Sequence, residues 1–169
     1  MKKTLLIYLM VGFAWNALAQ QSAEEAMGKL DFLVGNWQGT AQATTGPGQQ
    51  LNLEQYELVE FRLNGRILLI EGKGYEKGDM VFNALAAVAF DEHKQEYEMT
   101  SWLSTGQNAQ AYLLVKGENT VEWGFDIPQG GKIKYDISLN DKGQWVETGQ
   151  YSPDGSQWYP SFNMLLTKK

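Results

Sequence analysis

The sequence predicts an all-β protein: an antiparallel up-and-down β-barrel of about ten strands preceded by one short N-terminal helix. Three observations lead to this prediction. Gly occurs 18 times and aromatic residues make up 12% of the chain, proportions that suit strands and tight turns better than a helical bundle. Turn-forming residues recur at short, regular intervals, and between them apolar and polar residues alternate.

The short connections favour a barrel over other all-β arrangements. Hairpin-length turns pair each strand with its sequence neighbour, and closing such a wide sheet removes two exposed edges. A two-sheet sandwich is the alternative, but it usually needs longer crossing connections that this chain does not contain.

One helix is predicted before the strands. Ser22 and Glu25 form a capping box, in which each side chain can bond the other residue's backbone N–H. Apolar residues then recur at helical spacing, namely Ala26, Met27, Leu30, Leu33 and Val34. Gly35 ends the predicted helix.

The strands are predicted from period-two alternation between turns. The clearest examples are residues 121–127, 133–139 and 162–166. Turns such as Asn64-Gly65 and Asp141-Lys142-Gly143 supply the positive φ that tight hairpins require.

Residues 1–19 are typical of a secretory signal peptide. A cationic start is followed by a dozen mostly apolar residues and the small-x-small sequence Ala17-Leu18-Ala19, so cleavage is expected before Gln20. The apolar run is shorter than a membrane span requires. Removing Lys2 and Lys3 changes the formal charge from −6 to −8. We therefore expect residues 20–169 to form a single barrel domain, exported to the periplasm or beyond the cell.

Composition excludes several functions. The net charge of −6 argues against a nucleic-acid partner. The chain has no Cys. Its one histidine, His93, lies in a polar turn beside Asp91 and Glu92, and one imidazole with two nearby carboxylates is not a recognised metal site. We expect an exposed turn histidine, no metal site and no cofactor. The Gly-x-Ser-x-Gly motif of serine hydrolases is absent, and we assign no catalytic residue.

The junction of helix and first strand carries the sequence Gly35-Asn-Trp37-Gln-Gly39. It resembles the signature of the lipocalins and the wider calycin group, and Gly39 makes it more similar to nitrobindin. The resemblance implies that Trp37 packs across the closed end of a barrel and that Gly35 permits a tight turn. Nitrobindin-like haem binders use a His near the C-terminal end as iron ligand. Residues 143–169 contain no His, so haem is not expected by that route.

The rest of the chain resembles an uncharacterised family of secreted bacterial calycin-like proteins, known as a domain of unknown function. The resemblance rests on residues 61–66, 123–125 and 149–158. It implies a fold more than a function.

Alternation predicts an aromatic barrel interior. The inward-facing residues that we expect to contact a ligand are Tyr97, Met99, Trp123, Tyr135 and Phe162. A barrel of about ten strands is difficult to fill with side chains, so we expect a cavity suited to an apolar or flat molecule. The alternative is a packed core made of the same residues.

Some carboxylates fall on faces that alternation predicts to point inward. Glu147 shares its face with Trp145 and Tyr151, Glu71 with Ile67 and Leu69, and Glu57 with Val59 and Phe61. Such groups could orient the polar head of a ligand, form an acid/base pair, or pair with Arg62 or Arg66. A register slip of one residue would return each of them to solvent.

Three functions remain open at this stage. The first is a non-enzymatic binding protein that holds a small apolar or amphipathic molecule, with Glu71 or Glu147 orienting its head. The second is an enzyme in which Glu71 and Glu147 act as acid and base. The third is a surface module that binds glycan or protein through exposed aromatics such as Trp102 and Trp158.

Overall fold

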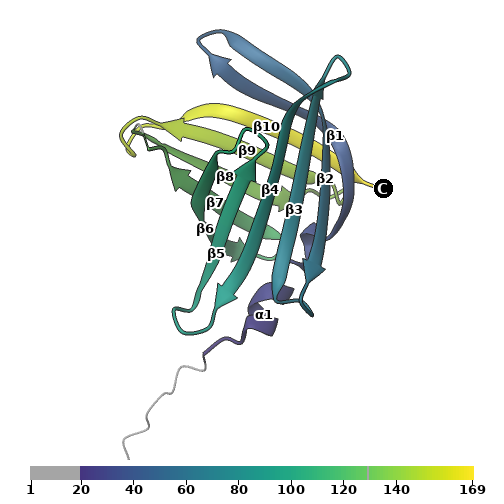
Figure 1. The fold of residues 1–169 in the computed structure, drawn as a ribbon, viewed down its shortest axis with the longest axis vertical. Helices are drawn as coiled ribbons and strands as arrows, with labels where there is room; N and C mark the ends of the chain where they lie inside the picture. The colour runs from purple at the N-terminus through teal and green to yellow at the C-terminus, as the bar shows by residue number, and fades with distance from the viewer. Residues whose placement is uncertain (1–19, 129) are drawn as a thin grey trace, which may run out of the picture.

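In the part of the chain that the structure describes, ten antiparallel strands close into one barrel, as the sequence predicts. The computed structural model describes residues 20–128 and 130–169, and the predicted signal peptide lies outside them. Each strand pairs with its sequence neighbours, and β10 returns to β1 (Figure 1). The elements are α1 Ala23–Gly28, a 3₁₀ turn Asp31–Leu33, β1 Gly35–Gly46, β2 Gln49–Arg62, β3 Ile67–Glu76, β4 Asp79–Asp91, β5 Glu96–Leu103, β6 Asn108–Gly117, β7 Thr120–Asp126, β8 Lys132–Leu139, β9 Trp145–Ser152 and β10 Tyr159–Lys168. Within the described ranges no helix is long and apolar enough to span a bilayer.

The predicted capping box is present at the start of α1. The Ser22 hydroxyl accepts from the Glu25 N–H at 3.2 Å, and the Glu25 carboxylate accepts from the Ser22 N–H at 3.1 Å. The predicted single helix is in fact two short pieces, because α1 ends at Gly28 and a separate 3₁₀ turn leads to Gly35. Gly35 has φ +139°, which the change of direction into β1 requires.

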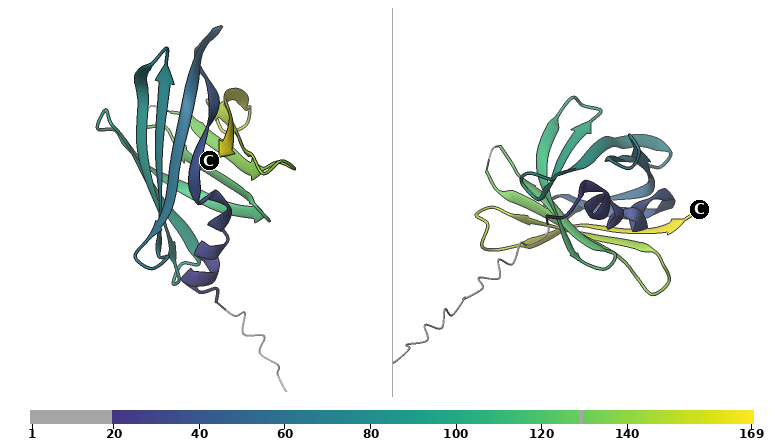
Figure 2. Two further views of the ribbon diagram at one scale, coloured as in Figure 1. Left: turned by 90° about the vertical axis from the view of Figure 1, so that its right-hand side faces the viewer. Right: turned by 90° about the horizontal axis from the view of Figure 1, so that it is seen from below.

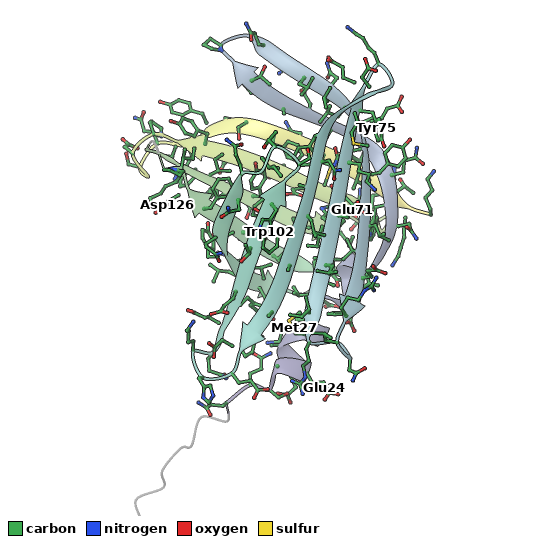
Figure 3. The ribbon with its side chains drawn as sticks, viewed as in Figure 1. Glu24, Met27, Glu71, Tyr75, Trp102 and Asp126 are labelled. Atoms are coloured by element: carbon green, nitrogen blue, oxygen red, sulfur yellow. The ribbon has the colours of Figure 1, made fainter. Side chains whose placement is uncertain are left out.

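Helix α1 lies at one end of the barrel (Figure 2). Met27 is buried and points toward the barrel, whereas Glu24 faces solvent (Figure 3). Two hydrogen bonds hold the helix: the Tyr97 hydroxyl donates to the Ala26 carbonyl, and the Ala23 N–H donates to the Glu92 carboxylate, both at 2.6 Å. This end of the barrel is therefore closed.

Trp37 packs within the closed end, in the position that the resemblance implies. Only 2% of its surface is exposed, and its indole N–H donates to the Leu33 carbonyl at 2.7 Å. Its ring meets Trp145 edge-on at 5.7 Å between centroids. Gly39 lies where β1 passes close to β10, and a Cβ there would collide with the Leu165 carbonyl. The core of the closed end also contains Leu30, Leu33, Val59, Leu68, Val88, Val121 and Leu166.

Candidate functional site

An aromatic row crosses the inner wall of three strands. Trp123 on β7 stands opposite Tyr135 on β8, Tyr135 stands opposite Gly149 on β9, and Gly149 stands opposite Phe162 on β10. Trp123 and Tyr135 stack at 4.2 Å between centroids with their planes 12° apart. Phe162 meets Tyr135 edge-on at 5.7 Å. A Cβ on Gly149 would lie 2.6 Å from the Tyr135 ring, so the glycine provides the space that the ring occupies.

Glu147 is a buried carboxylate beside this row. Trp123 donates its indole N–H to Oε1 at 3.1 Å, and Trp145 donates to Oε2 at 3.2 Å. Both oxygens therefore act as acceptors, an arrangement that suits the ionised form. Burial raises the pKa of Glu147 to about 7, and the two indole hydrogen bonds oppose that rise.

Glu57 on β2 is the second interior carboxyl group. It stands opposite Gly72 on β3, where a Cβ would lie 2.8 and 2.9 Å from the two carboxylate oxygens. The Gln55 amide donates to Glu57 Oε1 at 2.7 Å. Burial raises the pKa of Glu57 to about 8; the Gln55 bond opposes that shift, and the charges of Glu147 and Glu71 add to it.

Several inward residues above the closed end are only half-buried. Glu57, Ile70, Trp123, Tyr135 and Phe162 point inward by register and yet keep part of their surface exposed. In a closed barrel the surface that an inward residue exposes faces the interior. Another part of the wall carries small side chains at inward positions, namely Ala84, Ala86, Ser101, Ala109 and Ala111. These small side chains occupy less of the interior than the aromatic row does.

Comparison with protein families identifies the chain through a match over residues 23–168. The protein belongs to the family described as Protein of unknown function (DUF1579). This agrees with the predicted likeness to a domain of unknown function, while the likeness to lipocalins and nitrobindin remains a resemblance. Among solved structures, the chain is similar to Rv2717c from M. tuberculosis with a TM-score of 0.60 and 12% identity, covering 85% of this chain and 97% of that one. At that identity the similarity supports the fold alone. A search of curated proteins finds no match.

The prediction that Glu71 points into the barrel of this DUF1579 protein is wrong. Glu71 lies on the outer face of β3 (labelled in Figure 3), where its carboxylate pairs with Lys73 at 2.7 Å. The run of four apolar residues at 67–70 does not alternate, so it fits either face equally well. In the structure Leu68 and Ile70 point inward, and Glu71 therefore points away from Glu147.

Tyr97 and Met99 point inward as predicted, but they lie toward the closed end of the barrel. Tyr97 bonds to α1 and packs against Phe90 at 5.1 Å between centroids. Met99 is buried in the core. Of the predicted ligand-binding residues, the structure brings together Trp123, Tyr135, Phe162 and Glu147; a ligand contact for each of them stays a prediction.

The sequence analysis did not identify Gln55, Gly72 or Gly74 as parts of the site. Both glycines lie inside β3, with a register shift after Gly74. Gly74 stands opposite Gln55, and a Cβ there would lie 2.9 Å from the Gln55 amide oxygen. A glycine within a strand often marks such a close approach, and that signal could have located the site.

The outer surface of the DUF1579 barrel has features of its own. A groove of about 770 Å³ runs over β1, β2, β9 and β10, and outward residues such as Thr40, Glu54 and Asn163 line it. Trp102 is 44% exposed on β5, and the Lys134 ammonium lies 4.5 Å from the centre of the half-buried Trp158 ring.

His93 is exposed in the β4–β5 turn, as predicted. Within residues 20–128 and 130–169, no three acidic or histidine side chains are grouped to hold a metal ion.

Proposed function

We propose that this protein is a binding protein that holds a small apolar or amphipathic molecule inside its barrel. The observation that carries the proposal is the row of Trp123, Tyr135 and Phe162, which remains partly exposed to the interior of a closed barrel. Large apolar side chains left exposed to internal water are a favourable surface for a ligand to cover.

Burial of an apolar tail would supply the free energy of binding. Burying a methylene group contributes about 0.8 kcal/mol, so a ten-carbon tail supplies roughly 8 kcal/mol before the cost of association is subtracted. Aromatic stacking against the tail or a flat ligand adds to this. In this proposal Glu57 and Glu147 orient the polar head of the ligand, and no bond is made or broken. The export predicted from residues 1–19 would place the activity in the periplasm or outside the cell.

Calorimetric titration with 1-decanol tests the proposal. Decanol is a neutral amphiphile, so it reports the apolar space without any contribution from charge. We expect saturable one-to-one binding to the wild-type protein. In Ala84→Phe a ring enters the interior from β4, and we expect the affinity to fall at least about tenfold because that ring occupies the space of the tail.

The matched control is Ala87→Phe on the same strand. Ala87 is also half-buried, but it faces outward, between Leu69 and Thr100. This variant should bind decanol as the wild type does. A wild-type protein that takes up no decanol would overturn the proposal, and so would equal losses of affinity in the two variants.

A further inference from the structure

Among the residues that the structure describes, two carboxyl groups share the barrel interior without a cationic partner. Among the described inward strand positions, Lys168 is the one Lys or Arg, and it lies at the closed end. Its ammonium is solvent-exposed and lies 5.2 Å from the centre of the Trp37 ring. Arg62 and Arg66 are exposed and pair with Glu60 and Glu92. No cationic side chain of the described interior is therefore available to neutralise Glu57 or Glu147 when either is ionised, and an unpaired charge is costly to bury.

The hydrogen bonds show which carboxylate oxygen of Glu57 and Glu147 lacks a donor among the described residues. Both carboxylate oxygens of Glu147 accept hydrogen bonds from indole N–H groups, and Glu57 Oε1 accepts one from the Gln55 amide. For Glu57 Oε2, no residue in the described part of the chain donates a hydrogen bond. Glu57 keeps part of its surface exposed to the interior. Of the oxygens of these two carboxyl groups, Glu57 Oε2 is thus the one left to accept a hydrogen bond from a ligand, and the charge of Glu147 acts on the same carboxyl group.

The surrounding rings suit a cation. Trp123 stacks on Tyr135 at 4.2 Å between ring centroids, and its N–H is committed to Glu147. Aromatic faces beside carboxylates are the surroundings in which proteins bind ammonium groups. An anionic head, such as that of a fatty acid, would meet like charge at the same place.

We propose that Gln55, Glu57, Glu147 and Trp123 form a binding site for the ammonium group of an amphipathic amine, whose apolar tail lies against Tyr135 and Phe162. This inference rests on the proposed function and names its ligand class. The ammonium donates to Glu57 Oε2 and supplies the positive charge that the interior lacks.

Titration of the wild-type protein with three ligands of equal tail length tests the proposal. At pH 7 we expect decylammonium to bind about tenfold more tightly than decanol, because a charge-assisted hydrogen bond is stronger than a neutral one. Decanoate should bind more weakly than decanol. If decanol binds and decylammonium binds no more tightly, the amine site is wrong while the proposed function stands. If none of the three binds, both fail.

Glu57→Gln and Glu71→Gln form a matched pair of variants. Glu57→Gln should remove the preference for decylammonium over decanol and leave decanol binding unchanged. Glu71→Gln changes the same type of residue on the outer face of the neighbouring strand and should keep the full preference. A preference that survives Glu57→Gln in a folded protein would overturn the proposal.

Proton release gives a readout that does not depend on a variant. The raised pKa of Glu57 leaves it largely protonated at pH 7, and a primary ammonium keeps its charge to about pH 10. Tyr135 stays neutral because burial and the charge of Glu147 raise its pKa. Lys168 and Glu71 lie outside the interior site. Binding of decylammonium should therefore release a proton, visible as a buffer-dependent heat, whereas decanol should release none. Equal proton release by the two ligands would contradict the assignment.

Discussion

Large inward side chains of the site stand opposite glycines. Gln55 faces Gly74, Glu57 faces Gly72, and Tyr135 and Phe162 both face Gly149. In each pair, a Cβ on the glycine would lie within 3.0 Å of its partner's side chain. The glycines thus make room for the polar and aromatic groups to lie along the wall. The shape of the site depends on residues that contribute no chemistry of their own.

Gly72→Ala should destabilise the protein by about 1–3 kcal/mol, because the added methyl group displaces the Glu57 carboxyl group. Unfolding in urea, followed by tryptophan fluorescence, measures the change. Gly117→Ala is the control, since a Cβ there meets nothing within 4 Å; its effect should stay within about 0.5 kcal/mol. Similar changes in both variants would mean that the contact with Glu57 is not what requires glycine at position 72.

At the scale of elements, α1 is held to the barrel by side chains of β5 and the β4–β5 turn. Tyr97 bonds to the Ala26 carbonyl, Glu92 to the Ala23 N–H, and Gln95 to Gln21 in both directions. The helix has only six residues, too few to be stable in isolation. Its presence at the barrel end therefore depends on these contacts and on the burial of Met27 and Leu30.

Tyr97→Phe should loosen α1 while the strands remain paired. Loss of one hydrogen bond removes about 1 kcal/mol, so hydrogen exchange in residues 22–30 should become several-fold faster. Mass spectrometry of exchanged peptides measures this. Tyr112→Phe is the control, because Tyr112 is an exposed residue of β6 whose hydroxyl bonds to Glu122. Unchanged exchange in α1 of Tyr97→Phe would show that apolar packing alone retains the helix.

At the scale of the whole molecule, the two interior carboxyl groups link stability to pH. The pKa of Glu57 rises to about 8 and that of Glu147 to about 7 in the folded protein, from the usual 4.5, chiefly through burial. The folded state therefore binds more protons than the unfolded chain between about pH 4.5 and 8. The stability that these two groups contribute is therefore fully present below that range and is lost as the pH rises through it.

We expect the free energy of unfolding to fall by about 2 kcal/mol or more between pH 5 and pH 8.5, since each pKa unit corresponds to about 1.4 kcal/mol. Urea titrations across this range measure the slope. In Glu57→Gln the free energy of unfolding should depend less on pH. In Glu71→Gln the dependence should stay unchanged, because Glu71 is half-exposed and paired with Lys73. Stability that rises with pH over this range would contradict the burial of both carboxyl groups.

The sequence by itself determined the class of fold, the closure of the barrel and the closed end. Turn residues, period-two alternation and the Ser22–Glu25 capping box are local signals, so they could be recognised without knowing what packs against what. The inward orientation of Trp123, Tyr135, Phe162, Glu57 and Glu147 followed from the same alternation.

Only the tertiary structure decided the register of β3 and the composition of the site. The apolar run at residues 67–70 carries no period, so pairing with β2 and β4 was needed to place Glu71 outside and Gly72 inside. The hydrogen bonds of Glu147 join residues on β7 and β9, and the space left by Gly72 and Gly149 arises between neighbouring strands. Contacts of this kind depend on how separate strands align, which no single segment of sequence specifies.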